Sequence, residues 1–262
     1  MVLNSPLYKS VKERVNSFRD KRLEELVRSR PLPQHVAVIM DGNRRYARRL
    51  GLSEEDGHRL GRNKLQEVLE WCFDLGIKVL TVYAFSTENF KRNEREVKSL
   101  LNLCKEELER ASRDSRIHKN QVKVNIIGHL DLLPEDLRES ARQIMDATKH
   151  YSKYVLNIAL AYGGRQEIID AIKKIAQDVR DKKLNVEDIN EERFSSYLYT
   201  KDVPDPDLIL RTSGEERISN FLLWQLAYSE LYFSDVYWPA LRKRDFLRAI
   251  YTYQQRKRKF GR

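Results

Sequence analysis

The chain has 262 residues and a formal net charge of +10, from 49 Lys and Arg residues against 39 Asp and Glu residues. It has no apolar run near the roughly 20 residues that span a bilayer and no apolar signal-peptide core at its N-terminus. Its two cysteines, Cys72 and Cys104, form no metal-binding or disulfide motif. These features argue against a membrane-spanning protein and a disulfide scaffold. They predict a cytoplasmic protein whose partner is anionic: a nucleic acid, a membrane surface or a phosphorylated substrate.

Residues 3–30 are predicted to form a basic helix, because apolar residues recur there at nearly helical spacing. Such a helix either packs on the domain or lies at an interface or over a site as a cover. Pro31 and Pro33 end it. We therefore expect an N-terminal basic helical segment at residues 1–33, followed by a single domain at residues 34–262, since no Gly/Ser/Pro-rich linker divides the chain.

Beyond residue 34, buried strands alternate with amphipathic helices. Short runs rich in apolar residues predict strands at residues 35–40, 79–85, 122–127, 154–161, 208–210 and 231–233. Helical spacing predicts helices at residues 57–75, 94–114, 134–150 and 165–180, with a basic terminal helix from about residue 242. This alternation predicts the α/β class, with a largely parallel central sheet of about six strands flanked by helices.

Polar residues cluster directly after four of these strands, at residues 41–46, 86–92, 162–165 and 211–220. The carboxyl ends of parallel strands meet at one edge of a sheet, where ligands bind. Asp41 followed by two arginines suits a magnesium ion and a diphosphate, although Asp41-Gly42-Asn43 also suits a simple turn. Four arginines in these clusters are able to surround two diphosphates through bidentate hydrogen bonds: Arg45, Arg92, Arg211 and Arg217.

Three other features give weaker signals. Gly163-Gly164-Arg165 opens a helix but lacks the spacing of a dinucleotide site. Asp205 and Asp207 precede a strand, which favours a loop over a metal site. His58, at a predicted helix start, either caps or packs there, or faces a phosphate as a protonated imidazole.

Several blocks resemble the cis-prenyltransferases of the undecaprenyl diphosphate synthase family. The blocks are residues 35–46, 57–61, 81–92, 162–165, 209–224 and 227–233, and the resemblance spans about residues 31–239. The sequences Asp-Gly-Asn-Arg-Arg-Tyr and Arg-Thr-Ser-Gly-Glu are most similar to the archaeal and eukaryotic polyprenol, or dolichol-type, branch.

The resemblance implies Mg2+-dependent, sequential cis-condensation of isopentenyl diphosphate onto an allylic diphosphate of the farnesyl or geranylgeranyl type. The product is a long-chain polyprenyl diphosphate, the precursor of a glycosyl carrier lipid. The resemblance also implies a homodimer, peripheral contact with a membrane surface, no nucleic-acid partner, and an apolar tunnel between the helices at residues 57–75 and 94–114 and the second strand. Two alternatives stay open: a non-catalytic partner subunit of such an enzyme, and a basic nucleic-acid-binding protein.

The resemblance also assigns roles to residues. Asp41 is catalytic and, with Glu230, binds Mg2+. Asn89 is the second catalytic residue, where the family is assigned a proton acceptor; because a neutral amide is a poor base, we expect Asn89 and Ser86 to position a diphosphate whose oxygen takes the proton. The allylic side comprises Gly42, Asn43, Arg44, Arg45, His58, Phe90 and Arg92, the isopentenyl side Arg211, Arg217 and Ser219, and further substrate-binding positions are Tyr46, Ser86, Thr87, Glu88 and Ile218.

The chain departs from the family pattern at three places. Glu54 stands where bacterial members commonly carry an arginine, and Arg44 replaces the usual bacterial glycine; we hypothesise that Arg44 supplies the missing charge. Phe90 replaces a frequent tryptophan. The terminal Lys259-Phe260-Gly261 resembles an Arg-x-Gly motif that reaches the neighbouring subunit's site, but without the guanidinium fork.

Overall fold

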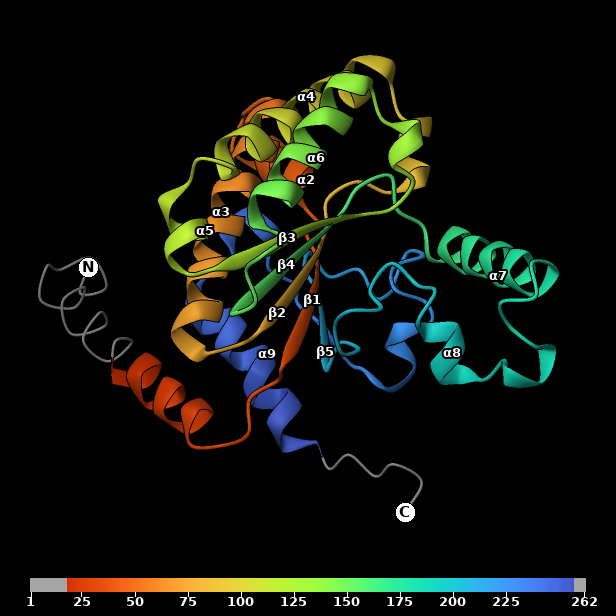
Figure 1. The fold of residues 1–262 in the computed structure, drawn as a ribbon. Coiled ribbons are helices and arrows are strands. Elements are labelled where there is room, and N and C mark those ends of the chain that lie inside the picture. The colour runs from red at the N-terminus through yellow and green to blue at the C-terminus, as the bar shows by residue number, and fades with distance from the viewer. Residues whose placement is uncertain (1–17, 257–262) are drawn as a thin grey trace, which may run out of the picture.

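The computed structural model describes residues 18–256. At its centre lies a six-stranded sheet of order β3-β4-β2-β1-β5-β6, in which every neighbouring pair is parallel (Figure 1). The strands are β1 (His35–Ile39), β2 (Val79–Tyr83), β3 (Val122–Ile127), β4 (Tyr154–Ala159), β5 (Leu208–Arg211) and β6 (Glu230–Phe233). The predicted parallel sheet of six strands is confirmed.

The central strands are buried on both faces, which explains their continuous apolar runs. In β1, Val36 and Val38 face the larger hydrophobic core, whereas Ala37 and Ile39 face a smaller one. The larger core also contains Val68 of α3 and side chains of α4, α6 and α9. The strand pattern therefore comes from burial on two sides and not from an alternation of apolar and polar residues.

Helices cover both faces of the sheet. Figure 1 shows α3, α4 and α6 on one side and α7 and α8 on the other. The helices are α2 (Asn43–Arg49), α3 (Glu54–Leu75), α4 (Glu94–Ala111), α5 (Ser115–Lys119), α6 (Glu135–Thr148), α7 (Gly164–Arg180), α8 (Glu191–Ser195) and α9 (Lys243–Gln255). A short 3-10 turn, η2 (Thr87–Lys91), follows β2.

The observed boundaries differ from the predicted ones where local polar bonds decide them. α3 begins at Glu54, three residues before the predicted start, because Ser53 and Asp56 form a reciprocal capping box. α2 was not predicted, because its seven residues contain only Tyr46 and Ala47 as apolar side chains. β2 and β4 each end two residues early, and the two residues that follow β2, Ala84 and Phe85, line the pocket described below.

The N-terminal helix packs on the domain. Residues 18–28 are helical and lie beside α9 (Figure 1). Val27 is fully buried, Gln254 Nε2 donates to its carbonyl at 2.9 Å, and Lys243 pairs with Glu24 at 3.3 Å. These contacts favour the packing interpretation for this part; predicted helix residues 3–17 and the Lys259-Phe260-Gly261 motif lie outside the described residues.

Within residues 18–256, none of the helices combines the length and the apolar character needed to cross a bilayer.

Candidate active site

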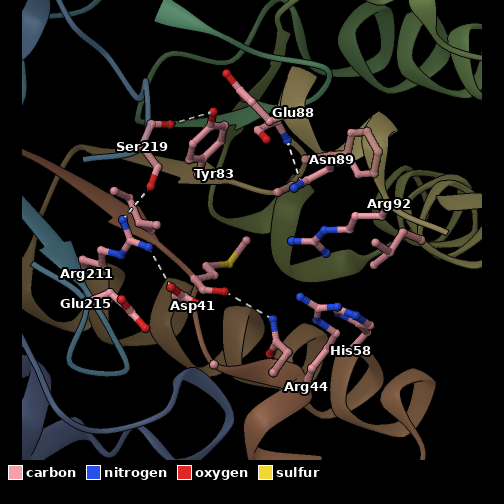
Figure 2. Close-up of a pocket in the computed structure, with 18 of the residues that line it drawn as sticks. Asp41, Arg44, His58, Tyr83, Glu88, Asn89, Arg92, Arg211, Glu215 and Ser219 are labelled. Carbon is pink, nitrogen blue, oxygen red and sulfur yellow. Dashed lines mark hydrogen bonds and ion pairs between the residues drawn. The ribbon is translucent and has the colours of Figure 1, made fainter. Parts of the chain in front are cut away.

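A pocket of about 820 Å³ lies at the carboxyl ends of β1, β2 and β5 (Figure 2). Residues from three of the four predicted strand-end clusters meet there, although they are far apart in the sequence. The predicted site residues that line it are Asp41, Gly42, Asn43, Arg44, Arg45, His58, Ser86, Glu88, Asn89, Arg92, Arg211, Arg217 and Ser219. The strand-end pattern therefore predicted the position of the pocket for three of its four clusters, whereas the fourth, at residues 162–165, does not line it.

Asp41 is held as a carboxylate between two arginines. Arg211 Nη2 lies 2.8 Å from its Oδ2, and Arg45 Nη2 lies 3.2 Å from its Oδ1. Burial raises the pKa of Asp41, but the hydrogen bond and charge of Arg211 and the charge of Arg45 outweigh it, so the pKa falls below its usual value. The Thr212 hydroxyl bonds the backbone of Asp41, which fixes the residue where β1 ends.

Arg211 organises one side of the pocket. Its side chain is only 4% exposed, and its Nη1 donates to Ser219 Oγ at 2.8 Å and to the Arg217 carbonyl. Glu215 bridges the other two guanidiniums, pairing with Arg45 at 2.7 Å and with Arg217. We call Asp41, Arg45, Arg211, Glu215, Arg217 and Ser219 the Arg211 cluster.

A second cluster faces it across the pocket (Figure 2). Glu96 accepts from Arg92 at 2.9 Å and from Arg44 at 3.3 Å, and so holds these two cations together. His58 lies beside them. Burial lowers the pKa of His58, Glu96 opposes this and the two arginines add to it, so the imidazole is neutral near pH 7 in the chain alone. We call Arg44, His58, Arg92 and Glu96 the Arg92 cluster.

The adjacent residues Arg44 and Arg45 belong to opposite clusters. Both lie in the first turn of α2, where consecutive side chains point in directions about 100° apart. Arg44 also lies 4.0 Å from Glu54, whose other oxygen accepts from Arg48 at 2.6 Å. Glu54 therefore pairs with cations at the pocket rim, consistent with the expectation that it does not bind a diphosphate itself.

Gly42 is required by the backbone and by its neighbours. Its φ of 101° lies in the left-handed region. A Cβ at this position would lie 2.7 Å from Tyr237 Cδ1 and 2.8 Å from Ser213 Cβ. Both distances are shorter than those at which Cβ atoms in proteins contact other atoms. Asp41-Gly42-Asn43 is thus a turn that also forms part of the pocket wall, and binding of a magnesium ion and a diphosphate there stays a prediction.

Asn89 has a structural role in its own turn. Its Oδ1 accepts from the Ser86 backbone amide at 3.0 Å, and its own backbone amide donates to the Ser86 carbonyl at 3.0 Å. These two bonds cap η2 and fix the direction of the side chain at the pocket wall. The carboxamide is neutral and its oxygen already accepts a hydrogen bond, which favours a positioning role over that of a base.

Four predicted substrate-binding residues do not line the pocket. Tyr46 packs edge-on against Tyr237, with ring centroids 6.3 Å apart, and Phe90 packs against Phe85 at 4.9 Å. The Thr87 hydroxyl donates to Glu88. The four residues are Tyr46, Thr87, Phe90 and Ile218.

Glu230 lies at the start of β6, whereas Asp41 follows the carboxyl end of β1, so the two residues lie at opposite ends of the parallel strands. The register pairs Glu230 with Leu208, whereas Arg211, next to Asp41, pairs with Phe233. Three strand residues separate these levels, a distance of about 10 Å. The Glu230 carboxylate pairs with Arg256 at 2.5 Å. Within one chain, Glu230 and Asp41 therefore do not form the predicted two-carboxylate metal site.

The donor set at Asp41 still fits a magnesium ion. Between residues 18 and 256, no three His, Cys, Asp or Glu side chains gather closely enough to hold a metal by themselves. Mg2+, however, is commonly bound by one or two carboxylates together with substrate phosphates. Asp41 provides one such carboxylate in a pocket lined by cations.

Sequence reasoning missed several lining residues. Glu215 and Asn220 lie inside the polar block at residues 211–220, so their location was available although no role was assigned. Tyr83 ends β2 and donates its hydroxyl to the Ser219 carbonyl at 3.3 Å. Arg48 and Leu100 complete the pocket from α2 and α4, and only the packing of these helices brings them there.

A second, smaller cavity of about 100 Å³ lies between α3 and α4. Its apolar lining comprises Leu65, Leu69, Phe73, Leu108, Ala111, Ile117, Leu156 and Ile158. The two helices are those predicted for the tunnel, but the strand is β4 and not β2. An ion pair between Arg62 and Glu107, at 3.1 Å, stands at its edge.

Comparison with known proteins places this chain in a family. The model of the family described as putative undecaprenyl diphosphate synthase matches residues 39–261. The tritrans,polycis-undecaprenyl-diphosphate synthase (geranylgeranyl-diphosphate specific) of Thermoplasma volcanium is 56% identical over 94% of this chain and 95% of its own length. The protein of the same name from Thermococcus kodakarensis is 53% identical over 98% of this chain and 96% of its own length.

Two solved structures are also similar. The lavandulyl diphosphate synthase of Lavandula x intermedia, in complex with dimethylallyl diphosphate, has a TM-score of 0.84 and 34% identity over 88% of this chain and 99% of that chain. A probable undecaprenyl diphosphate synthase of Campylobacter jejuni has a TM-score of 0.73 and 37% identity over the same shares. The chain thus belongs to the undecaprenyl diphosphate synthase family, the cis-prenyltransferases.

Proposed function

We propose that this prenyltransferase condenses isopentenyl diphosphate units, one after another and with cis geometry, onto an allylic diphosphate. The observation that carries the proposal is the pair of arginine clusters on opposite sides of one pocket, which suits two diphosphates (Figure 2). The two relatives above are named for geranylgeranyl diphosphate, which favours that primer over farnesyl diphosphate. The product is a long-chain polyprenyl diphosphate, the precursor of a glycosyl carrier lipid.

The allylic diphosphate is proposed to bind on the side of the Arg92 cluster. Arg92 and Arg44 pair with Glu96 in the chain alone, so an incoming diphosphate competes with this carboxylate for both cations. His58 has a buried Nε2 without a hydrogen-bond partner among the described residues, and this atom is available to the diphosphate. A diphosphate nearby would favour the protonated imidazole and raise its pKa.

Isopentenyl diphosphate is proposed to bind to Arg211, Arg217 and Ser219. Arg211 is buried and prepositioned, whereas the Arg217 side chain is 60% exposed and pairs with Glu215. Replacing that exposed pair costs little free energy. Arg217 can therefore move to a diphosphate while Arg211 provides the fixed contact.

Asp41 is proposed to hold Mg2+ together with diphosphate oxygens. When bound, the ion supplies positive charge that offsets the charge developing on the departing diphosphate. Arg211 and Arg45 keep Asp41 ionised and oriented. A role for Glu230 as a second metal ligand stays a prediction, and it requires a different carboxylate position from the one in the single chain.

In the proposed step, the allylic C–O bond breaks and the diphosphate leaves with its electron pair. The double bond of isopentenyl diphosphate attacks the allylic carbon, one C–C bond forms, and one proton leaves to create the new cis double bond. A diphosphate oxygen accepts that proton. Asn89 and Ser86 position this diphosphate, and the arginines of the two clusters stabilise the negative charge that develops on the departing diphosphate.

The growing chain is proposed to extend from the pocket toward the cavity between α3 and α4, whose lining is apolar. A homodimer is proposed from the family resemblance, and α7 exposes Ile169 and Ile172 as apolar side chains for such an interface. A cytoplasmic location and peripheral contact with a membrane surface are proposed as well.

The test is incorporation of labelled isopentenyl diphosphate with Mg2+ and either geranylgeranyl or farnesyl diphosphate, with the products sized by chromatography. We expect long-chain products that require a primer, with geranylgeranyl diphosphate preferred. Arg211→Met, which removes the fixed cation, should abolish incorporation, whereas Arg193→Met on α8, away from the pocket, should not. Absence of product from the wild-type chain with both primers would refute the proposal.

A further inference from the structure

Asn220 joins three segments around the pocket. Its backbone oxygen accepts from the Gly164 amide at 2.7 Å, and its Oδ1 accepts from the Arg165 amide at 2.9 Å. Its Nδ2 donates to Glu88 Oε1 at 3.0 Å. Because Asn220 directly follows Ser219, these bonds connect the Arg211 cluster to the first turn of α7 and to η2.

Two glycines allow Asn220 to approach α7 this closely. A Cβ on Gly163 would lie 2.8 Å from Asn220 Nδ2 and 2.9 Å from Thr87 Oγ1, and a Cβ on Gly164 would lie 2.7 Å from Leu223 Cγ. A Cβ on Gly163 would displace these two side-chain ends, whereas a Cβ on Gly164, which would also lie 3.0 Å from the Leu223 backbone nitrogen, would push the segments apart. The Gly163-Gly164 pair, which lacks the spacing of a dinucleotide site, is therefore explained by the approach of the Asn220 loop and not by a phosphate.

The backbone around Asn220 depends on these anchors. Asn220 has a φ of 64° and Ser219 a φ of 48°, both in the left-handed region. Asn tolerates this conformation better than most residues. Tyr83 adds a bond to the Ser219 carbonyl from β2 (Figure 2). A segment in this conformation keeps a single position only while its neighbours hold it.

We propose that Asn220 is a positioning residue that fixes the Arg211 cluster relative to η2, and so sets the separation of the two bound diphosphates; this rests on the proposed function. Glu88 immediately precedes Asn89, whose side chain caps the same turn. Movement of η2 against Ser219 changes the distance between the reacting carbons, and such reactions are sensitive to shifts of about 1 Å. Asn220 acts through Ser219 and Glu88 and does not contact the reacting atoms.

The first test is Asn220→Gly. Glycine accepts the positive φ and keeps the backbone bond to Gly164, so only the two side-chain bonds are lost. We expect kcat/KM for isopentenyl diphosphate to fall about tenfold, with circular dichroism unchanged. The control is Asn185→Gly, which removes a similar bond from Asn185 Nδ2 to Asp188 at 3.1 Å, away from the pocket, and should leave the kinetics unchanged. Equal kcat/KM for Asn220→Gly and the wild type would overturn the inference.

The second test is rescue. Asn220→Asp keeps an acceptor for the Arg165 amide but places a second carboxylate against Glu88, and should lower kcat/KM at least about tenfold. In the Glu88→Gln background the same change should cost less than about threefold, because the new amide can donate to the new carboxylate. An equal loss in both backgrounds would refute a direct Asn220–Glu88 contact in the working enzyme.

A third measurement needs no substrate. Hydrogen exchange at the Arg165 amide should accelerate about tenfold in Asn220→Gly, because this amide loses its acceptor. An unchanged rate of hydrogen exchange at the Arg165 amide would overturn the inference about Asn220 without affecting the proposed function. Absence of product from the wild-type chain refutes the proposed function and the inference together, whereas an active wild type with an equally active Asn220→Gly variant refutes only the inference.

Discussion

Lowering the pH below 6.5 is expected to destabilise the fold through His35, the first residue of β1. The side chain is fully buried. Because the Pro204 carbonyl can only accept, Nδ1 donates to it at 2.6 Å, and the Thr81 hydroxyl donates to Nε2 at 2.8 Å. Thr81 in turn accepts from Asn157 at 3.0 Å. The network therefore requires the neutral imidazole.

The expected magnitude follows from the pKa of His35. Burial lowers it from 6.5 to about 4, against the opposing effects of the Pro204 carbonyl and Asp207. Well above pH 6.5, His35 is neutral in both the folded and the unfolded chain, so it does not lower the free energy of unfolding there. Between pH 6.5 and about 4 the unfolded chain binds a proton that the folded chain does not, which costs about 3 kcal/mol in total, of which about 2 kcal/mol falls between about pH 7.5 and pH 5.0.

The assay is urea unfolding at these two pH values, with the free energy of unfolding obtained by linear extrapolation. His58, with a lowered pKa, adds to the effect, and Glu167, with a pKa raised by burial, opposes it. His35→Gln isolates the contribution: its loss of stability between the two pH values should be about 2 kcal/mol smaller than that of the wild type. His150→Gln, an exposed control, should behave like the wild type. Equal pH dependence in His35→Gln and the wild type would refute the reasoning.

Four further outcomes are expected. Asp41→Asn should lower kcat at least about 100-fold with native circular dichroism, and a loss below about tenfold in the incorporation assay would contradict its role. Gly42→Ala places an alanine at a positive φ, with its Cβ too close to the side chains of Tyr237 and Ser213. It should therefore reduce the free energy of unfolding, measured in urea, by about 3 kcal/mol, and unchanged stability would contradict these close contacts. Glu167 is 2% exposed and accepts a hydrogen bond from the Tyr162 hydroxyl. Glu167→Ala should therefore lower the free energy of unfolding by about 3 kcal/mol in the same assay, and Glu167→Gln, which keeps an acceptor, clearly less. Equal losses in the two variants would argue against the hydrogen bond. Removing Mg2+ with a chelator should abolish incorporation reversibly, and undiminished turnover would exclude a magnesium role.

The sequence by itself determined the elements whose signal is local. Apolar runs located the strands, and helical spacing located the long helices within a few residues. Because parallel strands end at one edge, the polar residues after β1, β2 and β5 could be placed in one pocket before any contact was known. The motifs in these segments also indicated the family, which the comparisons confirmed.

The tertiary structure decided what depends on strand order, register and helix packing. Asp41 meets Arg211, 170 residues away, because β5 lies beside β1; Glu230 is separated from Asp41 because β6 begins level with the start of β5. The packing of the loop at Asn220 against the α7 turn joined two segments that the sequence left unconnected. Local patterns report the burial of each residue, whereas these pairings arise from distances between segments that only the assembled chain defines.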